Sequence, residues 1–171
     1  MCQDSGEMKN ELNNGAQASE NSEAATRKVQ LFRVGPLQFG VFEEELATIA
    51  GWREPTPLPH SPESVLGVVS IQGRMLTVMD LARLSGSDTA ITDESYRQII
   101  ALRGDEQLAV AASALGETVD FSPSDAGVRT NGNERFVSCV FSAPGADARL
   151  LNVSELFAAA LRGRERRRRR F

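Results

Sequence analysis

Few residues of this 171-residue chain have the types and spacing that catalysis or metal binding requires. The chain has one histidine, His60, and two cysteines, Cys2 and Cys139. A histidine can activate a cysteine as a nucleophile, but His60 stands in a proline-rich stretch without a residue that would orient its ring. Structural zinc sites are built from clusters of Cys and His, and this set is too small. The sequence therefore predicts no metal, no cofactor and no enzymatic activity.

Three consecutive carboxylates, Glu43, Glu44 and Glu45, are the other candidate for acid–base or metal chemistry. Acidic residues in the first turn of a helix also stabilise the helix dipole, which is the simpler interpretation. We expect a short helix from Glu43 to Ala50 that ends at Gly51. The chain also lacks the glycine-rich motifs that bind phosphate groups, so nucleotide chemistry is not indicated.

The net charge of −4 conceals an uneven distribution. Residues 162–170 contain seven Arg and one Glu, a balance of +6, so the rest of the chain carries −10. A nucleic-acid-binding domain carries its basic face on the fold itself, which excludes that class for the acidic body. The Arg-rich tail, residues 162–171, leaves two alternatives. It is a solvated run that contacts the acidic body, or it attaches the protein to nucleic acid or an anionic membrane. The residues that would make such an attachment are Arg164, Arg166, Arg167, Arg168, Arg169 and Arg170.

The first 28 residues differ in composition from the rest of the chain. They are rich in Asn, Gln, Ser, Glu and Ala, and their only large apolar side chains are Met1, Met8 and Leu12. Such a stretch buries too little apolar surface to offset the entropy of ordering, so residues 1–28 are predicted to be a disordered leader. The alternative is a short amphipathic helix through Leu12. Because the chain has neither a secretory signal nor an apolar run of 18 residues, we expect a cytoplasmic protein.

From Val29 onward the chain shows many short apolar segments separated by turn signals. The run from Glu54 to Pro62 has four prolines and should be extended and outside any sheet. A short helix is expected from Pro62 to Leu66, with Ser61 as its N-cap. Short strands with frequent turns indicate a mainly β protein, a small barrel or sandwich.

Three hairpins and a final helix account for the rest of the pattern. In the stretch from Gly67 to Leu81, two apolar strands flank a turn at Gln72-Gly73, and Asp80 is placed to cap a helix. Ser154 is expected to cap the final helix. Its expected apolar face consists of Leu156, Phe157, Ala160 and Leu161. The other expected hairpins pair residues 97–102 with 108–111, and residues 136–141 with 150–153.

The residues from Val65 to Leu81, Val-Leu-Gly-Val-Val-Ser-Ile-Gln-Gly-Arg-Met-Leu-Thr-Val-Met-Asp-Leu, resemble a characteristic segment of the CheW-like family of bacterial chemosensory coupling proteins. The family pattern there is roughly Val-Leu-Gly-Val-Val-Asn-Leu-Arg-Gly-x-x-Leu-Pro-Val-Val-Asp-Leu. Residues 32–41 resemble the family's opening hairpin, residues 44–49 its helix, and residues 149–157 its closing strand and helix. The similarity covers residues 29–161.

This resemblance implies a fold of two small five-stranded SH3-like barrels that lie side by side, with short helices. It also implies a non-catalytic adaptor that joins methyl-accepting receptors to the regulatory domain of a CheA-type histidine kinase, in a two-component pathway that controls motility. The position of the matching residues implies a receptor-binding surface near the groove between the barrels, with an apolar patch around Leu46 and Val69 dominating the affinity. The full set of receptor-binding residues implied in this way is Leu46, Gly67, Val69, Ser70, Gln72 and Gly73. No residues are assigned to kinase binding.

The sequence departs from the family pattern at several positions. Ser70 replaces an Asn, Gln72 an Arg and Thr77 a Pro, while Ala109–Ser113 stands where Gly-x-x-Val-Asp is usual. Glutamine lacks the charge and the planar donor fork of arginine. These departures favour a weak or lost kinase link, and thus an alternative in which the protein is an accessory member that binds receptor or a dedicated partner without coupling the kinase.

Overall fold

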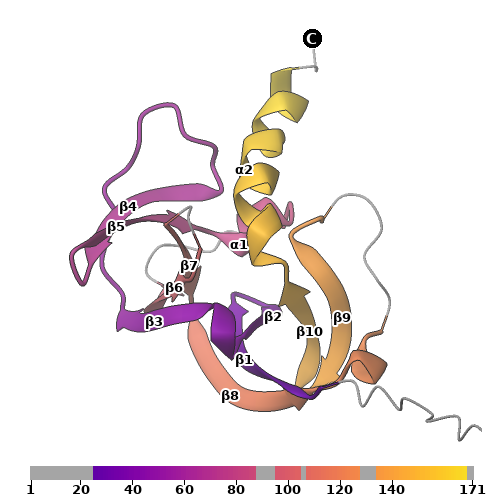
Figure 1. Ribbon diagram of the computed structural model, residues 1–171. Helices are drawn as coiled ribbons and strands as arrows, with labels where there is room; N and C mark the ends of the chain where they lie inside the picture. The colour runs from indigo at the N-terminus through magenta and orange to yellow at the C-terminus, as the bar shows by residue number, and fades with distance from the viewer. Residues whose placement is uncertain (1–24, 88–94, 105–106, 128–133, 169–171) are drawn as a thin grey trace, which may run out of the picture.

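The computed structural model describes residues 25–87, 95–104, 107–127 and 134–168, with side chains described as far as residue 160. These residues form two five-stranded β-sheets, which curve into two barrels lying side by side (Figure 1). The expected mainly β fold of two small SH3-like barrels is therefore confirmed. The first sheet has the strand order β8 (Ala114–Phe121), β1 (Arg27–Val34), β2 (Leu37–Phe42), β10 (Ala146–Leu151) and β9 (Val137–Ala143). The second has the order β3 (Leu46–Gly51), β6 (Gln98–Leu102), β7 (Leu108–Ala112), β5 (Arg74–Met79) and β4 (Val65–Ile71).

Among the described residues, four named helical segments connect or follow these strands. They are η1 (Glu43–Glu45), α1 (Leu81–Leu84), η3 (Pro123–Asp125) and α2 (Val153–Arg168). Within the described residues, no helix is long and apolar enough to cross a membrane.

The larger of two apolar cores is shared by both barrels, and the smaller lies within the first barrel. Strand β1 contributes to both because successive side chains of a strand point to opposite faces of the sheet. Val29 and Leu31 enter the smaller core, whereas Phe32 and Val34 enter the larger one. Strand β1 therefore lies between the two apolar cores.

The β4–β5 hairpin and the helix after it agree with the sequence-based expectation. The turn residues Gln72 and Gly73 both have positive φ angles, 51° and 77°, as two-residue turns that match the strand twist require. Asp80 caps α1, with its Oδ1 accepting hydrogen bonds from the backbone N–H groups of Ala82 and Arg83.

The helix expected from Glu43 to Ala50 is wrong. Only Glu43–Glu45 form a single 3-10 turn, and Leu46–Gly51 is strand β3, paired antiparallel with β6. The side chains of β3 alternate between half-buried and exposed, a period of two. Pairing with β6 therefore outweighed the weak helix tendency of this short segment, which includes the β-branched Thr48 and Ile49.

The helix expected from Pro62 to Leu66 is also wrong. A turn bonds the N–H of Val65 to the carbonyl of Pro62, and β4 begins at Val65. Ser61 accordingly caps no helix, and its hydroxyl donates to the carbonyl of Leu58. The proline-rich run is extended only in part, because Pro59 and His60 form a turn in which His60 has a φ of 60°. Contrary to the expectation that it lies outside any sheet, the run makes one isolated bridge, from Thr56 to Val68 at the edge of β4.

Two further details differ from the sequence pattern. Strand β8 carries six exposed residues out of eight and shows no apolar alternation, so it was not expected; it is held by its pairing with β1. The third hairpin is tighter than expected, since β10 already begins at Ala146 after a turn at Pro144-Gly145.

Helix α2 begins at Val153, two residues earlier than an N-cap at Ser154 would place it. Ser154 lies inside its first turn rather than at the N-cap, and its hydroxyl donates to Oδ1 of Asn152. Leu156 and Ala160 are buried against the larger core, whereas Phe157 is 40% exposed. The helix continues through Arg168 and projects away from the barrels (Figure 1), so the backbone of most of the Arg-rich tail is helical.

Two expectations lie largely outside the described residues. The leader predicted for residues 1–28 is described only from residue 25, and β1 begins at Arg27, two residues earlier than the pattern indicated. The side chain of Leu161, expected on the apolar face of the last helix, is likewise outside the described part.

Candidate partner-binding surface

The structure brings five of the six implied receptor-binding residues together on the β4–β5 hairpin. Ser70, Gln72 and Gly73 are exposed at its tip. Gly67 and Val69 are buried, Val69 with only 7% of its surface accessible. A partner can therefore contact the tip directly. Gly67 and Val69 are buried, so their role is in the conformation and packing of the hairpin.

Gly67 marks a close approach, and the neighbour is Thr56 of the same chain. The φ angle of Gly67 is +145°, and a Cβ atom at this position would lie 2.6 Å from the carbonyl carbon of Thr56. Thr56 and Val68 exchange two backbone hydrogen bonds of 2.9 Å there. The glycine thus allows the proline-rich loop to dock on the outer strand of the second sheet.

Leu46 lies apart from this hairpin in the strand order. It begins β3, at the opposite edge of the second sheet from β4. Its side chain is half-buried against the larger core, and its carbonyl accepts a 2.7 Å hydrogen bond from Nε of Arg103. The sequence-based set therefore divides into a hairpin tip and one separate residue.

A cavity of about 340 Å³ lies beside Leu46, where elements of both barrels meet. One wall is Glu45, in the connection from the first barrel to the second. The second barrel contributes the end of β6 and the start of β7, and the first barrel contributes the beginning of α2. The lining residues are Glu45, Leu102, Arg103, Gly104, Leu108, Val153 and Ser154. We call this the junction cavity.

Glu45 is a half-buried carboxylate in an unfavourable electrostatic position. Its Oε2 atom is buried, and it has no hydrogen-bond partner among the described residues. Burial raises the pKa of Glu45 above 4.5, and the adjacent Glu44 adds to the rise, while Arg27 opposes it. Arg27 is itself engaged, since its Nε donates to Oε1 of Glu44 at 2.6 Å and its guanidinium lies 3.2 Å over the ring of Phe42.

The sequence could not distinguish Glu45 from its two neighbours. All three were interpreted as solvated first-turn carboxylates, yet Glu43 and Glu44 are exposed and only Glu45 is turned into the junction. Arg103, Leu108 and Val153 carry no local signal of a shared site, because they meet only through the packing of two barrels.

The raised pKa of Glu45 predicts a pH-dependent effect of the Glu45→Gln substitution. A carboxyl group whose pKa is raised by folding contributes its full stability below the unfolded pKa and loses it as the pH rises through the folded pKa. Glutamine does not titrate. We therefore expect Glu45→Gln to be slightly more stable than the wild type at pH 7, with the difference disappearing near pH 4. Urea unfolding at both pH values measures the difference in the free energy of unfolding between Glu45→Gln and the wild type. The same difference at pH 4 and pH 7 would contradict the prediction.

The structure does not bring His60 and Cys139 together as a catalytic pair. Cys139 is buried within the smaller core, and His60 is exposed in the proline-rich loop with a φ of 60°. Among the described residues, no group of three or more His, Cys, Asp or Glu side chains could hold a metal ion. A second hollow of about 530 Å³, beside β9, is lined by Asp125, Gly127, Val140, Phe141, Ser142 and Asp147. Asp125 and Asp147 already accept hydrogen bonds there, from the N–H of Ser122 and the hydroxyl of Ser142.

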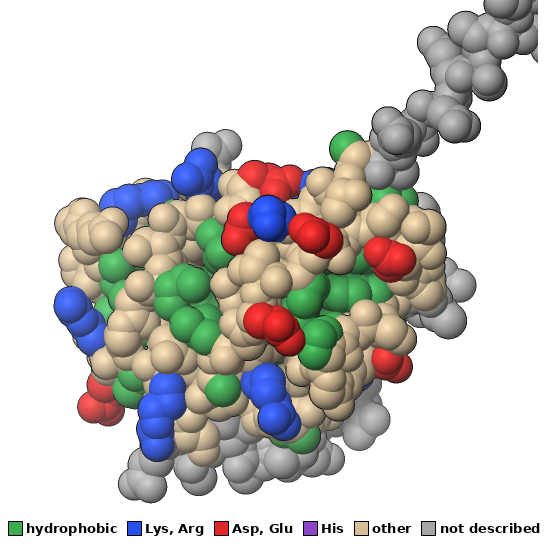
Figure 2. Space-filling model, turned by 90° about the horizontal axis from the view of Figure 1, so that it is seen from below, with side chains coloured by type: hydrophobic (Ala, Val, Ile, Leu, Met, Phe, Trp, Pro, Cys, Tyr) green, Lys and Arg blue, Asp and Glu red, His purple; other side chains and the backbone are tan. Residues whose placement is uncertain are grey.

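The charged side chains on the underside of the molecule are of both signs. Figure 2 shows a basic side chain between acidic ones toward the upper edge of this face, further lysines and arginines at its rim, and apolar patches across its middle. A face of this kind lacks the continuous basic stripe that binding to a phosphate backbone requires.

Comparison with known proteins agrees with this architecture. Residues 28–161 match the family model of the CheW-like domain. The chain is 29% identical over 99 residues to a chemotaxis protein CheW of Rhizobium meliloti, an alignment that covers 58% of this chain and 64% of the relative. It is 36% identical over 74 residues to a probable chemotaxis protein CheW of Rhizobium etli, covering 43% and 46%. Protein FrzA of Myxococcus xanthus is 31% identical over 84 residues, covering 49% and 52%.

The alignments with these curated relatives span less than two thirds of the relatives' length. A crystal structure of the scaffolding protein TtCheW from Thermoanaerobacter tengcongensis shares the fold, with a TM-score of 0.65 at 17% identity over 75% of this chain and 90% of that one. Because the family model covers most of the chain, the resemblance noted from the sequence is confirmed, and the chain belongs to the CheW-like domain family.

Proposed function

We propose that this protein is a non-catalytic, cytoplasmic adaptor that links a methyl-accepting receptor to the regulatory domain of a CheA-type histidine kinase. The observation that carries the proposal is the CheW-like domain over residues 28–161. The relatives named as chemotaxis proteins support the same pathway. The exposed β4–β5 tip and the junction cavity are the two surfaces that this proposal assigns to partners.

Binding experiments test the two halves of the link separately. The protein is titrated, by calorimetry, with the soluble cytoplasmic hairpin of a receptor and with the kinase regulatory domain from the same genome. Binding of both supports the adaptor. Binding of the receptor alone would instead support the accessory protein that does not couple the kinase. Binding of neither would contradict the proposal.

The replacement of an arginine by Gln72 predicts weak kinase coupling. Gln72 is exposed at the hairpin tip, where an arginine could form charge-assisted hydrogen bonds that glutamine cannot. If the partner still carries a hydrogen-bond acceptor opposite position 72, Gln72→Arg should tighten the complex with that partner about fivefold. Gly73→Ala serves as a control for distortion of the turn. Tight binding of both partners by the wild type would contradict the prediction of weak coupling.

The Arg-rich tail supplies the competing hypothesis from another class, attachment to nucleic acid or an anionic membrane. Deleting residues 162–171 discriminates between the two functions. An adaptor keeps its receptor affinity without the tail, since the helix residues packed against the core, Leu156 and Ala160, remain. A protein that works through the tail loses its target.

A further inference from the structure

Two polar groups line the junction cavity, the carboxylate of Glu45 and the guanidinium of Arg103, and neither has all of its hydrogen-bonding capacity satisfied. On one side, Oε2 of Glu45 is buried and accepts no hydrogen bond from the described residues. On the other, Arg103 contributes its guanidinium, whose Nε donates to the carbonyl of Leu46. The described residues include no ion pair between Glu45 and Arg103, so the two groups do not satisfy each other.

The rest of the lining is apolar or small. Leu102 and Leu108 are buried members of the larger core, and Val153 packs against it. A ligand in the cavity therefore needs an apolar stem for these side chains and a polar end for Glu45 and Arg103. This combination fits a side chain of moderate length carried on a partner protein.

The charges of the cavity restrict the polar end. A lysine would face the positive charge of Arg103, and a carboxylate would face Glu45. A hydroxyl group must donate and accept through the same oxygen atom, so it reaches both groups only where they lie within two hydrogen-bond lengths of each other. A carboxamide offers N–H donors and a carbonyl acceptor on different atoms. It can donate to Glu45 and accept from Arg103 at the same time.

We infer that the junction cavity binds an asparagine or glutamine side chain of the receptor, its carboxamide bridging Glu45 and Arg103. This inference rests on the proposed function and extends it by naming the recognition chemistry. The cavity adjoins Leu46, so the contact is continuous with the surface already assigned to the receptor.

The test is a titration of the receptor hairpin fragment against substituted proteins. Glu45→Leu removes the acceptor and should weaken binding at least tenfold, whereas Glu45→Gln retains an uncharged acceptor and should weaken it about threefold. Arg103→Met should also weaken binding. Glu43→Leu is the matched control, because it removes an exposed carboxylate of the same turn that does not line the cavity, and its effect should stay below about twofold.

A coupling measurement then identifies the receptor residue. Each Asn and Gln of the fragment is changed to Ala and titrated against the wild type and Glu45→Leu. One substitution should weaken binding to the wild type about tenfold and leave binding to Glu45→Leu unchanged. Thermal unfolding verifies that each variant is folded, and Glu45→Met replaces Glu45→Leu if the branched side chain lowers the melting temperature.

Failure of this inference is distinguishable from failure of the proposed function. Equal affinity of the wild type and Glu45→Leu would overturn the assignment of the cavity while leaving the adaptor intact. If no Asn or Gln substitution in the fragment loses its effect when Glu45 is leucine, the proposal that a carboxamide binds in the cavity is wrong. If the wild type does not bind the fragment at all, the proposed receptor-binding function is contradicted, and this inference is contradicted with it.

Discussion

Replacing Gly67 by alanine is expected to lower the free energy of unfolding by about 3 kcal/mol. Two costs combine at this position. A φ of +145° is strained for any residue with a Cβ, and the added methyl group would collide with the backbone of Thr56. Because a backbone carbonyl cannot move aside as a flexible side chain does, the paired hydrogen bonds between Thr56 and Val68 should be lost.

Gly73→Ala is the matched comparison for Gly67→Ala. Gly73 also has a positive φ, +77°, but its Cβ position opens to solvent. Only the backbone strain remains, so the expected loss is about 1 kcal/mol. Urea unfolding of both variants measures the difference. Equal losses would contradict the close approach of Thr56 as the reason for a glycine at position 67.

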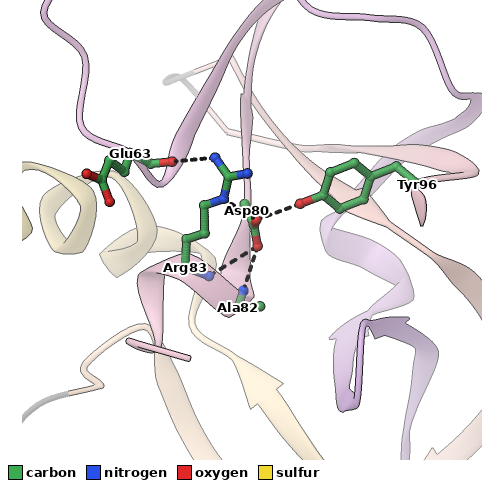
Figure 3. Close-up of polar contacts among 5 residues, drawn as sticks. All are labelled: Glu63, Asp80, Ala82, Arg83 and Tyr96. Carbon is green, nitrogen blue, oxygen red and sulfur yellow. Dashed lines mark hydrogen bonds and ion pairs between the residues drawn. The ribbon is translucent and has the colours of Figure 1, made fainter. Parts of the chain in front are cut away.

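Substituting the buried Asp80 is the second change with a large expected effect. Figure 3 shows this carboxylate accepting hydrogen bonds from two backbone N–H groups of α1 and from the hydroxyl of Tyr96, at 2.5 Å. Arg83 approaches the same carboxylate, its Nε 3.1 Å from Oδ2. The side chain of Asp80 is fully inaccessible to solvent. It therefore connects the end of β5, helix α1 and the segment just before β6.

We expect Asp80→Ala to lower the free energy of unfolding by about 3–4 kcal/mol, since it leaves several donors without their acceptor. Asp80→Asn can still accept at one atom and should lose about 2 kcal/mol. Tyr96→Phe removes one donor and should lose about 1 kcal/mol. In a double-mutant cycle, Tyr96→Phe should cost little once Asp80 is alanine. Additive losses from the two substitutions would contradict a direct bond between them.

The features that were correctly predicted are those with local causes. The hairpin from Val65 to Met79 results from two apolar strands around Gln72-Gly73, a pair that accepts positive φ angles. The cap of α1 results from an aspartate just before an apolar turn, a short-range interaction. The spacing of short apolar segments and turn signals indicated the mainly β fold, and the order of the charged residues showed the uneven charge, because neither depends on which segments meet.

Only the tertiary structure decided the features whose partners are distant in sequence. Leu46–Gly51 became a strand because β6, about 50 residues later, pairs with it, and β8 has no apolar pattern of its own and is held by β1. The junction cavity joins residues from position 45 to position 154. Whether one of three identical glutamates is buried depends on how two barrels pack across a common core, and this information is absent from any short stretch of the chain.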